Sequence, residues 1–206
     1  MSHAAARFSL GPNLILLQSR SLALLYLLLL GLFLSVEVLL ILRKRSKDGH
    51  VPEDRGFRSR ALVVFLLSNL VAIPCLRFFP AAAFGTYLTS YVGVALLLLG
   101  LLLRWWSIIH LGRFFTVDVM IAADHRVIDS GPYRLIRHPS YTGILLIVAG
   151  VALCFGNLAS ALVLIVPNVA LLIQRMRIEE AALSQGLGEP YRAYMSRTKR
   201  LIPGIY

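Results

Sequence analysis

The residues most able to do chemistry lie in one polar stretch, residues 125–143, which reads HRVIDSGPYRLIRHPSYTG and is called the motif stretch below. It combines two imidazoles, several arginines, an aspartate and two tyrosines, and hydrophobic runs long enough to enter a bilayer flank it. Polar groups are costly to remove from water unless something binds them. The stretch therefore predicts a ligand site at a membrane surface, for a ligand with several charges or hydroxyls.

The end of the motif stretch predicts the start of a helix. A proline pushes the preceding residue out of the helical region and suits the first helical position, so a helix should begin at Pro139 with His138 at its mouth. Free backbone N–H groups there, such as those of Ser140 and Tyr141, would favour an anionic ligand group. The alternative is that His138 merely caps the helix; the polar side chains around it favour the ligand site.

A second polar patch, RMRIEEAAL, follows the last hydrophobic run. Arg175 and Glu179 are four residues apart and share one helix face. An exposed ion pair at this spacing would add only about 0.3–0.5 kcal/mol to helix stability. However, Glu179 and Glu180 interrupt a basic segment, and adjacent carboxylates repel each other unless a cationic or hydroxylated group takes them. An oriented carboxylate suits paired ribose hydroxyls, and an arginine suits a substrate carboxylate.

The composition predicts an all-α integral membrane protein. The chain is 58% hydrophobic, above the roughly 45–50% of soluble domains, and its mean hydropathy is +0.75. A net charge of +11 could indicate nucleic acid in a soluble protein, but here the basic residues bracket apolar runs. Such residues report topology and contact with anionic headgroups. We expect one compact membrane domain with membrane lipids and no nucleic acid as partners, and the oligomeric state stays open.

Five hydrophobic runs predict five transmembrane helices, at residues 21–42, 61–79, 84–103, 141–155 and 158–173. Pro74 should kink or end the second, and Arg104-Trp105-Trp106 closes the third as an interface anchor. Gly156-Asn157 is short enough to require a tight antiparallel hairpin. The fourth run reaches only about 22 Å as a helix, so it either stops short of the far side or begins in the headgroup region.

Charges in the loops predict the orientation. Seven Lys and Arg residues lie in 43–60, whereas 156–157 has none, and basic residues return in 104–137 and after Arg175. The positive-inside rule then places the N-terminus outside, and the motif stretch, its pocket and the C-terminal tail in the cytoplasm.

We divide the chain into 1–103, with three N-terminal spans, and 104–206, with the motifs, the hairpin and the cytoplasmic tail. Residues 111–130 lack a helical period and predict an irregular loop with a short amphipathic segment along the interface.

The remaining titratable residues carry weaker indications. Glu37 lies inside the first span, where a charge can mark function, but it is within two turns of the helix end and we favour contact with water. Cys75 and Cys154 lie in apolar runs without CxxC spacing, which predicts buried thiols rather than a disulfide or a metal site. The other histidines lack metal-ligand spacing, so we expect no metal.

Together these motifs resemble the isoprenylcysteine carboxyl methyltransferase family, within the membrane methyltransferases that include phospholipid N-methyltransferases. The resemblance rests on the motif stretch, then RMRIEEAAL, then LGEPYRAYMSRTKRLIPGIY, next to a hairpin, and covers roughly residue 103 to the C-terminus. The N-terminal spans carry no family motif. The resemblance implies methyl transfer from S-adenosylmethionine, with S-adenosylhomocysteine as product.

The resemblance also implies roles for individual residues. Arg175 should be catalytic and should face the carboxylate of the substrate, and Glu180 matches the second acid of the family's paired glutamates. A carboxylate acceptor needs no general base; for a thiol or amine acceptor, Glu180 is our candidate base. The residues implied to contact the cofactor are His125, Arg126, Val127, Ile128, Tyr133, His138, Pro139, Ser140, Tyr141 and Glu179.

The short layout resembles prokaryotic members of the family, which favours a prokaryotic plasma membrane. A site on the cytoplasmic face flanked by spans can be entered from the bilayer, so we expect a lipid-like acceptor, with the carboxylate of a prenylcysteine-like compound implied by the resemblance. Two alternatives are an NADPH-dependent membrane reductase acting on sterols or enones, and a non-enzymatic scaffold that binds anionic lipid. RHPSYTG followed by RIEE favours the methyltransferase.

Overall fold

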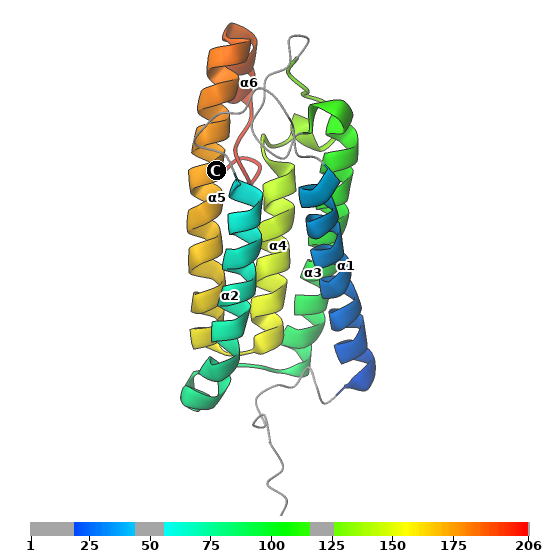
Figure 1. Ribbon diagram of the computed structural model, residues 1–206, viewed down its shortest axis with the longest axis vertical. Helices are drawn as coiled ribbons and strands as arrows, with labels where there is room; N and C mark the ends of the chain where they lie inside the picture. Colours follow the sequence, from blue (N-terminus) through cyan, green and yellow to red (C-terminus); the bar gives the residue numbers. More distant parts are fainter. Residues whose placement is uncertain (1–18, 44–55, 116–125, 206) are drawn as a thin grey trace, which may run out of the picture.

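The computed structural model describes residues 19–43, 56–115 and 126–205, and within them the chain forms a bundle of long helices (Figure 1). The helices are α1 (Arg20–Arg43), α2 (Phe57–Phe78), α3 (Tyr87–Leu111), α4 (Pro139–Phe155), α5 (Leu158–Leu187) and α6 (Glu189–Arg197). Short 3-10 turns, η3 (Pro80–Ala82), η4 (Gly112–Phe114) and η5 (Gly131–Arg134), lie between them. Extended pairing among the described residues consists of two isolated bridges.

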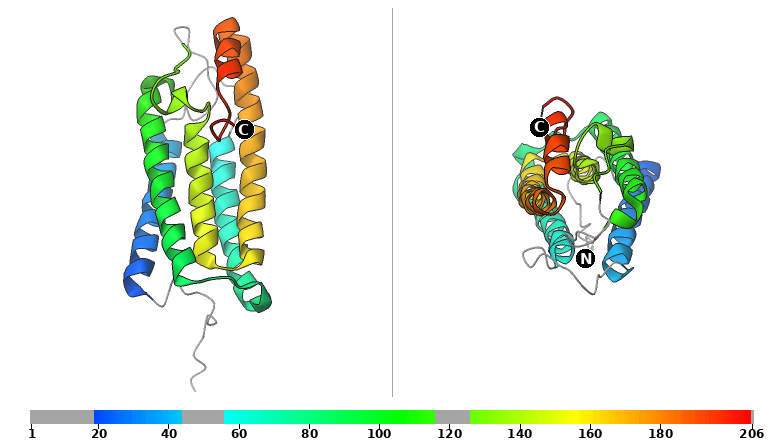
Figure 2. Two further views of the ribbon diagram at one scale, coloured as in Figure 1. Left: turned by 180° about the vertical axis from the view of Figure 1, so that it is seen from behind. Right: turned by 90° about the horizontal axis from the view of Figure 1, so that it is seen from above.

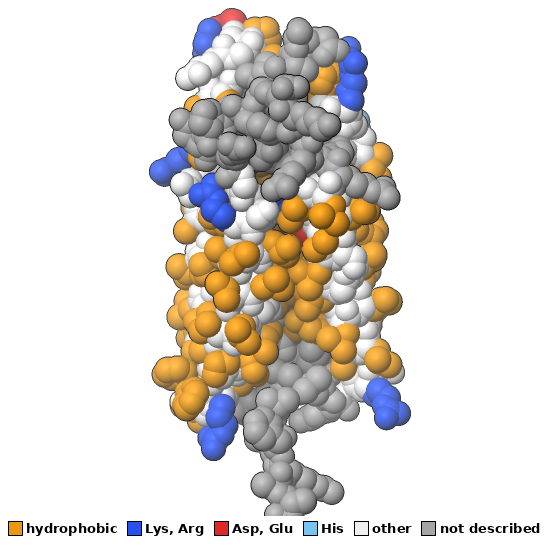
Figure 3. All heavy atoms as spheres, in the orientation of Figure 1, with side chains coloured by type: hydrophobic (Ala, Val, Ile, Leu, Met, Phe, Trp, Pro, Cys, Tyr) orange, Lys and Arg blue, Asp and Glu red, His pale blue; other side chains and the backbone are white. Residues whose placement is uncertain are grey.

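The lengths and composition of these helices fit a membrane. Four helices in the described part are long and apolar enough to cross a bilayer: α1, α2, α3 with η4, and α5. The fifth apolar helix, α4, has 17 residues and is shorter than a usual span. Hydrophobic side chains cover the middle of the bundle, with Lys and Arg towards its two ends (Figure 3). The prediction of an all-α, multi-pass membrane protein with about five membrane helices is confirmed.

Helices α1 to α5 alternate in direction, so both polar patches lie at one end of the bundle. The end of α3, the start of α4 and the end of α5 lie at this end, with η5 and α6 beside them (Figures 1 and 2). Helix α4 lies between α3 and α5, while α1 packs on α3 and α2 on α5. This arrangement brings together side chains that are distant in the sequence.

Helix α2 continues through Pro74 to Phe78, so Pro74 does not end it. The predicted bounds of the third span differ from the structure. Helix α3 begins at Tyr87, after a capping box formed by Thr86 and Thr89, and continues to Leu111. The division at 103/104 therefore falls inside α3, and we propose it only as a description of where the motifs lie.

The turn between α4 and α5 is the predicted tight hairpin. Gly156 ends α4 with a φ of 60°, which favours glycine, and Asn157 caps α5 by accepting a hydrogen bond from the Ser160 amide at 3.1 Å. The Asn157 side-chain amide also donates to the Phe79 carbonyl at 2.8 Å. This single residue thus joins the hairpin to the end of α2.

Close contact between α3 and α4 depends on four glycines. A Cβ atom added at Gly150 would lie 2.5 Å from the carbonyl oxygen of Gly93, and one at Gly100 would lie 2.5 Å from that of Gly143. Small residues let helix backbones approach closely in membranes. Gly143, the last residue of RHPSYTG, therefore serves helix packing rather than ligand contact.

We expect Gly150→Ala to destabilise the protein by about 1–3 kcal/mol, the usual cost of overpacking, because the new methyl group would meet the α3 backbone. Thermal unfolding in detergent micelles measures this loss. Gly31→Ala in α1 is the matched control, since nothing lies within 4 Å of a Cβ atom there. Equal melting temperatures for the two variants would contradict the close packing of α3 on α4.

Candidate active site

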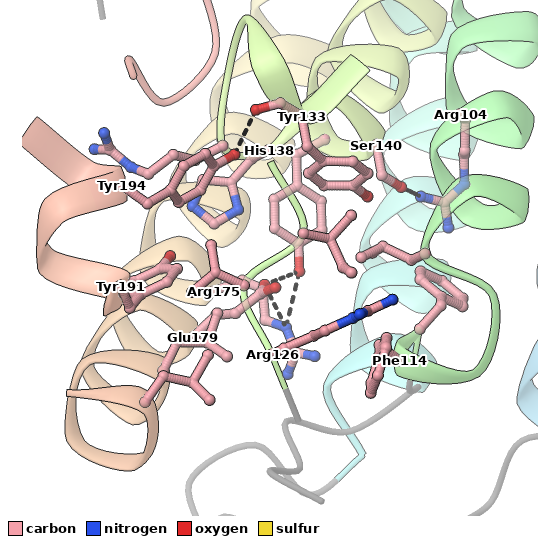
Figure 4. Close-up of a pocket in the computed structure, with 18 of the residues that line it drawn as sticks. Arg104, Phe114, Arg126, Tyr133, His138, Ser140, Arg175, Glu179, Tyr191 and Tyr194 are labelled. Atoms are coloured by element: carbon pink, nitrogen blue, oxygen red, sulfur yellow. Dashed lines mark hydrogen bonds and ion pairs between the residues drawn. The ribbon is translucent and has the colours of Figure 1, made fainter. Parts of the chain in front are cut away.

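A cavity lies at the end of the bundle where the two polar patches meet, and is called the first cavity below (Figure 4). Predicted site residues that line it are Arg126, Val127, Ile128, Tyr133, His138, Ser140, Tyr141, Arg175 and Glu179. Pro139 and Glu180 are buried beside it without lining it, and His125 lies outside the described residues. Within the described part of the chain, no group of His, Cys, Asp or Glu side chains is placed to hold a metal ion.

Tyr141 links the motif stretch to the second patch. Its hydroxyl donates a hydrogen bond to Oε2 of Glu179 at 2.6 Å and accepts one from Nε of Arg175 at 3.1 Å (Figure 4). Nε of Arg175 also lies 4.0 Å from Glu179 Oε2, so the predicted i,i+4 pair is present, with the tyrosine hydroxyl shared between its members. The Arg175 guanidinium stacks over the Phe57 ring at 4.9 Å. The three side chains fix one another's orientation at the cavity wall.

His138 lies at the mouth of α4, as predicted. Its ring stacks on that of Tyr141, with centroids 5.3 Å apart, and no side-chain cap of the helix forms. The expectation of a free Tyr141 amide is wrong, because this N–H donates to the His138 carbonyl at 3.0 Å. The residue before the proline leaves the helical region and turns its own carbonyl toward the first turn.

Glu180 joins three parts of the chain that are distant in sequence. Its carboxylate accepts hydrogen bonds from Nε of Arg137 at 2.9 Å and NH2 of Arg200 at 2.7 Å, and lies 3.1 Å from Nε2 of His138. The backbone reinforces this junction, because the amides of Arg137 and His138 donate to carbonyls of Lys199 and Arg200. A carboxylate held by two guanidinium groups and an imidazole is poorly suited to take up a proton. The geometry instead fits a structural anchor.

Tyr133 is positioned by side chains from two other helices. The Tyr194 hydroxyl on α6 donates to the Tyr133 carbonyl at 2.7 Å, and His110 at the end of α3 stacks on the Tyr133 ring and contacts the Ser130 hydroxyl at 2.9 Å. Burial raises the pKa of Tyr194 to about 12 and raises that of Tyr133 further. Both phenols therefore stay protonated at neutral pH. Gly131 allows the turn, since its φ is +56° and a Cβ atom would lie 2.6 Å from the His110 ring.

Glu37 and Arg104 form a buried ion pair, which corrects two predictions. We expected Glu37 to reach water and Arg104 to anchor the interface, but their residues are only 7% and 3% exposed. Nε of Arg104 lies 2.6 Å from Oε1 of Glu37, its NH1 group donates to the Ser140 hydroxyl at 2.9 Å, and Arg58 lies 3.3 Å from Glu37 Oε2. Opposite charges inside a membrane protein compensate each other. The contacts of Glu37 on α1 with Arg58 on α2 and Arg104 on α3 therefore join these three helices near the start of α4.

We expect Glu37→Gln to lower stability by about 1–3 kcal/mol, the cost of leaving a buried charged group without full compensation. The amide keeps the size of the side chain but removes the charge opposite Arg104. Thermal unfolding in detergent measures the loss, with Glu189→Gln as control, because Glu189 forms an exposed pair with Arg192. A melting temperature unchanged in Glu37→Gln would show that the pair adds no stability.

A second cavity adjoins the first on the α1 and α2 side. Arg58, Arg104, Tyr141 and Arg175 line both cavities. Away from these residues the second cavity is mainly apolar, and its remaining lining is Phe33, Glu37, Phe57, Ala61, Leu62, Phe65, Ile144, Asn168, Leu171 and Leu172. The tyrosine–arginine contact therefore stands where a polar and an apolar chamber meet.

Several residues of this site were not predicted from the sequence. Arg58, Arg104, Tyr191, Tyr194 and Phe114 all line the first cavity. Two opposite charges in separate apolar runs could have indicated the Glu37–Arg104 pair, and the YRAY spacing could have indicated two tyrosines near one helix face. The sequence around Phe114 offered no comparable pattern.

Comparisons with known proteins show which family the chain resembles. The model of the isoprenylcysteine carboxyl methyltransferase (ICMT) family matches residues 93–185. Protein-S-isoprenylcysteine O-methyltransferase B of Arabidopsis thaliana is 31% identical over 145 residues, which cover 69% of this chain and 73% of that protein. The Schizosaccharomyces pombe protein-S-isoprenylcysteine O-methyltransferase is 33% identical over 159 residues, covering 70% of this chain and 66% of that one.

A solved structure has a similar fold. The eukaryotic intramembrane Ras methyltransferase ICMT superimposes with a TM-score of 0.62 at 24% identity, covering 87% of this chain and 65% of that one. The chain thus spans slightly less than two thirds of the solved protein. This likeness extends over the N-terminal helices, where the sequence carries no family motif.

Proposed function

The chain belongs to the isoprenylcysteine carboxyl methyltransferase family, and on this premise we propose that it is a membrane methyltransferase that uses S-adenosylmethionine to methylate the carboxylate of an isoprenylcysteine-like lipid. The observation that carries the proposal is the meeting of a polar and an apolar cavity at Tyr141 and Arg175. A reaction between a polar nucleoside donor and a lipid acceptor needs such a junction.

The polar and apolar side chains that line the first cavity fit S-adenosylmethionine. Glu179 offers a carboxylate for the two ribose hydroxyls, and Tyr141 holds that carboxylate toward the cavity. Leu111, Phe114 and Leu187 provide apolar surface for adenine. Arg126 offers a positive group for the carboxylate of the amino acid tail. When bound, the cofactor supplies a methyl group on an already activated sulfonium.

Arg175 is the side chain we assign to the acceptor carboxylate. It lines both cavities, and its contacts with Tyr141 and Phe57 hold the guanidinium in one orientation. A guanidinium matches a carboxylate with two parallel hydrogen bonds, and a carboxylate is already deprotonated at neutral pH. No base is then required, which agrees with the position of Glu180 outside the cavity lining. We accordingly assign Glu180 the role of anchor for the C-terminal segment.

We also propose that the cavity end of the bundle faces the cytoplasm of a prokaryotic cell, with the N-terminus outside. The excess of Lys and Arg in 43–60 supports this orientation. The family match favours the methyltransferase over the reductase and over the lipid-binding scaffold.

The direct test is transfer of a labelled methyl group from S-adenosylmethionine to N-acetyl-S-farnesylcysteine by purified protein in lipid vesicles. We expect a labelled product that releases methanol in mild base, as a methyl ester does and an N-methyl amine does not. A labelled product that is stable in base would indicate methylation of an amine instead of a carboxylate. Label found only in small water-soluble acceptors, or in none, would contradict a lipid carboxylate.

A further inference from the structure

The second cavity changes from charged to aromatic along its length, and Glu37, which pairs with Arg58 and Arg104, lies at its charged end. Arg58 and Arg104 lie at the end that it shares with the first cavity, and Phe33 and Phe65 lie further toward the middle of the bundle. Seven residues separate Arg58 from Phe65 on α2, which is about 10 Å of helix. An amphiphile with a polar head at Arg175 and a hydrocarbon chain toward the two phenylalanines matches this order of groups, and the proposed acceptor is such a molecule.

Phe33 and Phe65 meet across the gap between α1 and α2. Their ring centroids are 5.4 Å apart in an edge-to-face arrangement with an interplanar angle of 73°, and the residues are only 5% and 4% exposed. Beyond Phe33, Leu29 and Tyr26 are also buried on α1 and belong to the packed core. The aromatic pair therefore closes the cavity against the core of the bundle.

We propose that Phe33 and Phe65 form the floor of the acceptor cavity and set the length of hydrocarbon chain that it accepts. The proposal rests on the proposed function and adds a length limit to it. A chain that enters beside Arg175 gains affinity for each methylene buried before it meets the two rings. A longer chain must displace the rings or leave its end outside the cavity, and it then gains nothing from its extra carbons.

The magnitude follows from burial. One methylene transferred from water to an apolar site changes affinity about fourfold. Phe65→Ala or Phe33→Ala would open space for several methylenes beyond the present floor. We therefore expect each variant to improve the binding of the longest acceptor, relative to the shortest, by about 16-fold or more, the gain from at least two buried methylenes. Phe65→Trp would shift the preference in the opposite direction, because the larger ring shortens the cavity.

The experiment measures the binding of acceptors that differ in chain length. Dissociation constants of S-geranyl-, S-farnesyl- and S-geranylgeranyl-N-acetylcysteine are measured by calorimetry with S-adenosylhomocysteine present, for the wild type and each variant. Affinity for S-adenosylhomocysteine alone reports that a variant is folded, and Phe65→Leu and Phe33→Leu replace any alanine variant that does not fold. Leu29→Ala is the matched control, since Leu29 is a buried residue of α1 that does not line the cavity.

The outcomes separate the floor from the proposed reaction. The floor is supported if the ratio of the affinities for the longest and the shortest acceptor rises in Phe33→Ala and Phe65→Ala and is unchanged in Leu29→Ala. This result would support the floor even if no methyl group is transferred. An affinity ratio within twofold of the wild-type ratio in both phenylalanine variants would overturn the proposal. An equal change of this ratio in Leu29→Ala would overturn it as well. Failure of the wild type to bind any of the three acceptors would also overturn it.

Discussion

Replacing Glu179 with alanine should abolish measurable binding of S-adenosylmethionine and S-adenosylhomocysteine. The carboxylate is the acidic group that lines the first cavity on α5, and the Tyr141 hydroxyl holds it in place at 2.6 Å. Hydrogen bonds to a charged group contribute about 1.5–3 kcal/mol each. Losing both ribose contacts should therefore weaken binding about 100-fold or more. Calorimetry with S-adenosylhomocysteine on protein purified in detergent measures the change.

Two companion variants show whether the effect belongs to the carboxylate. Glu189→Ala removes an exposed acid at the start of α6 and should leave the affinity unchanged. Tyr141→Phe keeps Glu179 but removes the hydroxyl that orients it, so we expect an intermediate loss of about tenfold, the worth of one hydrogen bond. Wild-type affinity in Glu179→Ala would rule out the ribose-binding role.

Arg175→Lys should lower kcat/KM for a carboxylate acceptor about 100-fold, the cost of losing a charged hydrogen bond in the transition state. Lysine keeps the charge but cannot reproduce the planar fork that pairs with a carboxylate. It would also lose the contact of the guanidinium with the Phe57 ring and the shared bond to Tyr141. Initial rates of methyl transfer over a range of acceptor concentrations measure this loss.

The affinity for S-adenosylhomocysteine distinguishes the acceptor role from general damage. It should stay within a few fold of the wild type in Arg175→Lys, because Glu179 remains. Arg177→Lys is the matched control, two residues along the same helix on an exposed surface, and should transfer methyl groups at the normal rate. Full activity in Arg175→Lys would favour a surface that attracts anions by charge alone.

Local sequence determined most of the secondary structure. The apolar runs predicted the membrane helices, and Pro139 and Gly156-Asn157 predicted the start of α4 and the hairpin. These features depend on the hydrophobicity of contiguous residues and on the backbone preferences of proline, glycine and asparagine. The helix ends were less predictable, because Arg104 does not end α3 once Glu37 compensates its charge.

The sequence also identified one half of the candidate site. The motif stretch and the second patch supplied Tyr141, Arg175 and Glu179, and the structure brings these side chains into contact. Their residue types alone indicated a polar ligand. The roles of individual residues within the patch were harder to assign, since Glu179 faces the cavity while its neighbour Glu180 turns to the C-terminal segment.

Tertiary structure alone decided what surrounds that polar half. Glu37 meets Arg104, Glu180 meets Arg200, and Phe33 meets Phe65 only after the helices have packed. Each pair joins residues that lie on different helices or loops, so no local pattern specifies the partner. The sequence therefore determined which segments enter the membrane and which groups could bind a polar donor. The apolar chamber beside them, and with it the proposed limit on the acceptor, arises from the packing of α1 and α2 against the rest of the bundle, because a cavity is defined by several helices at once.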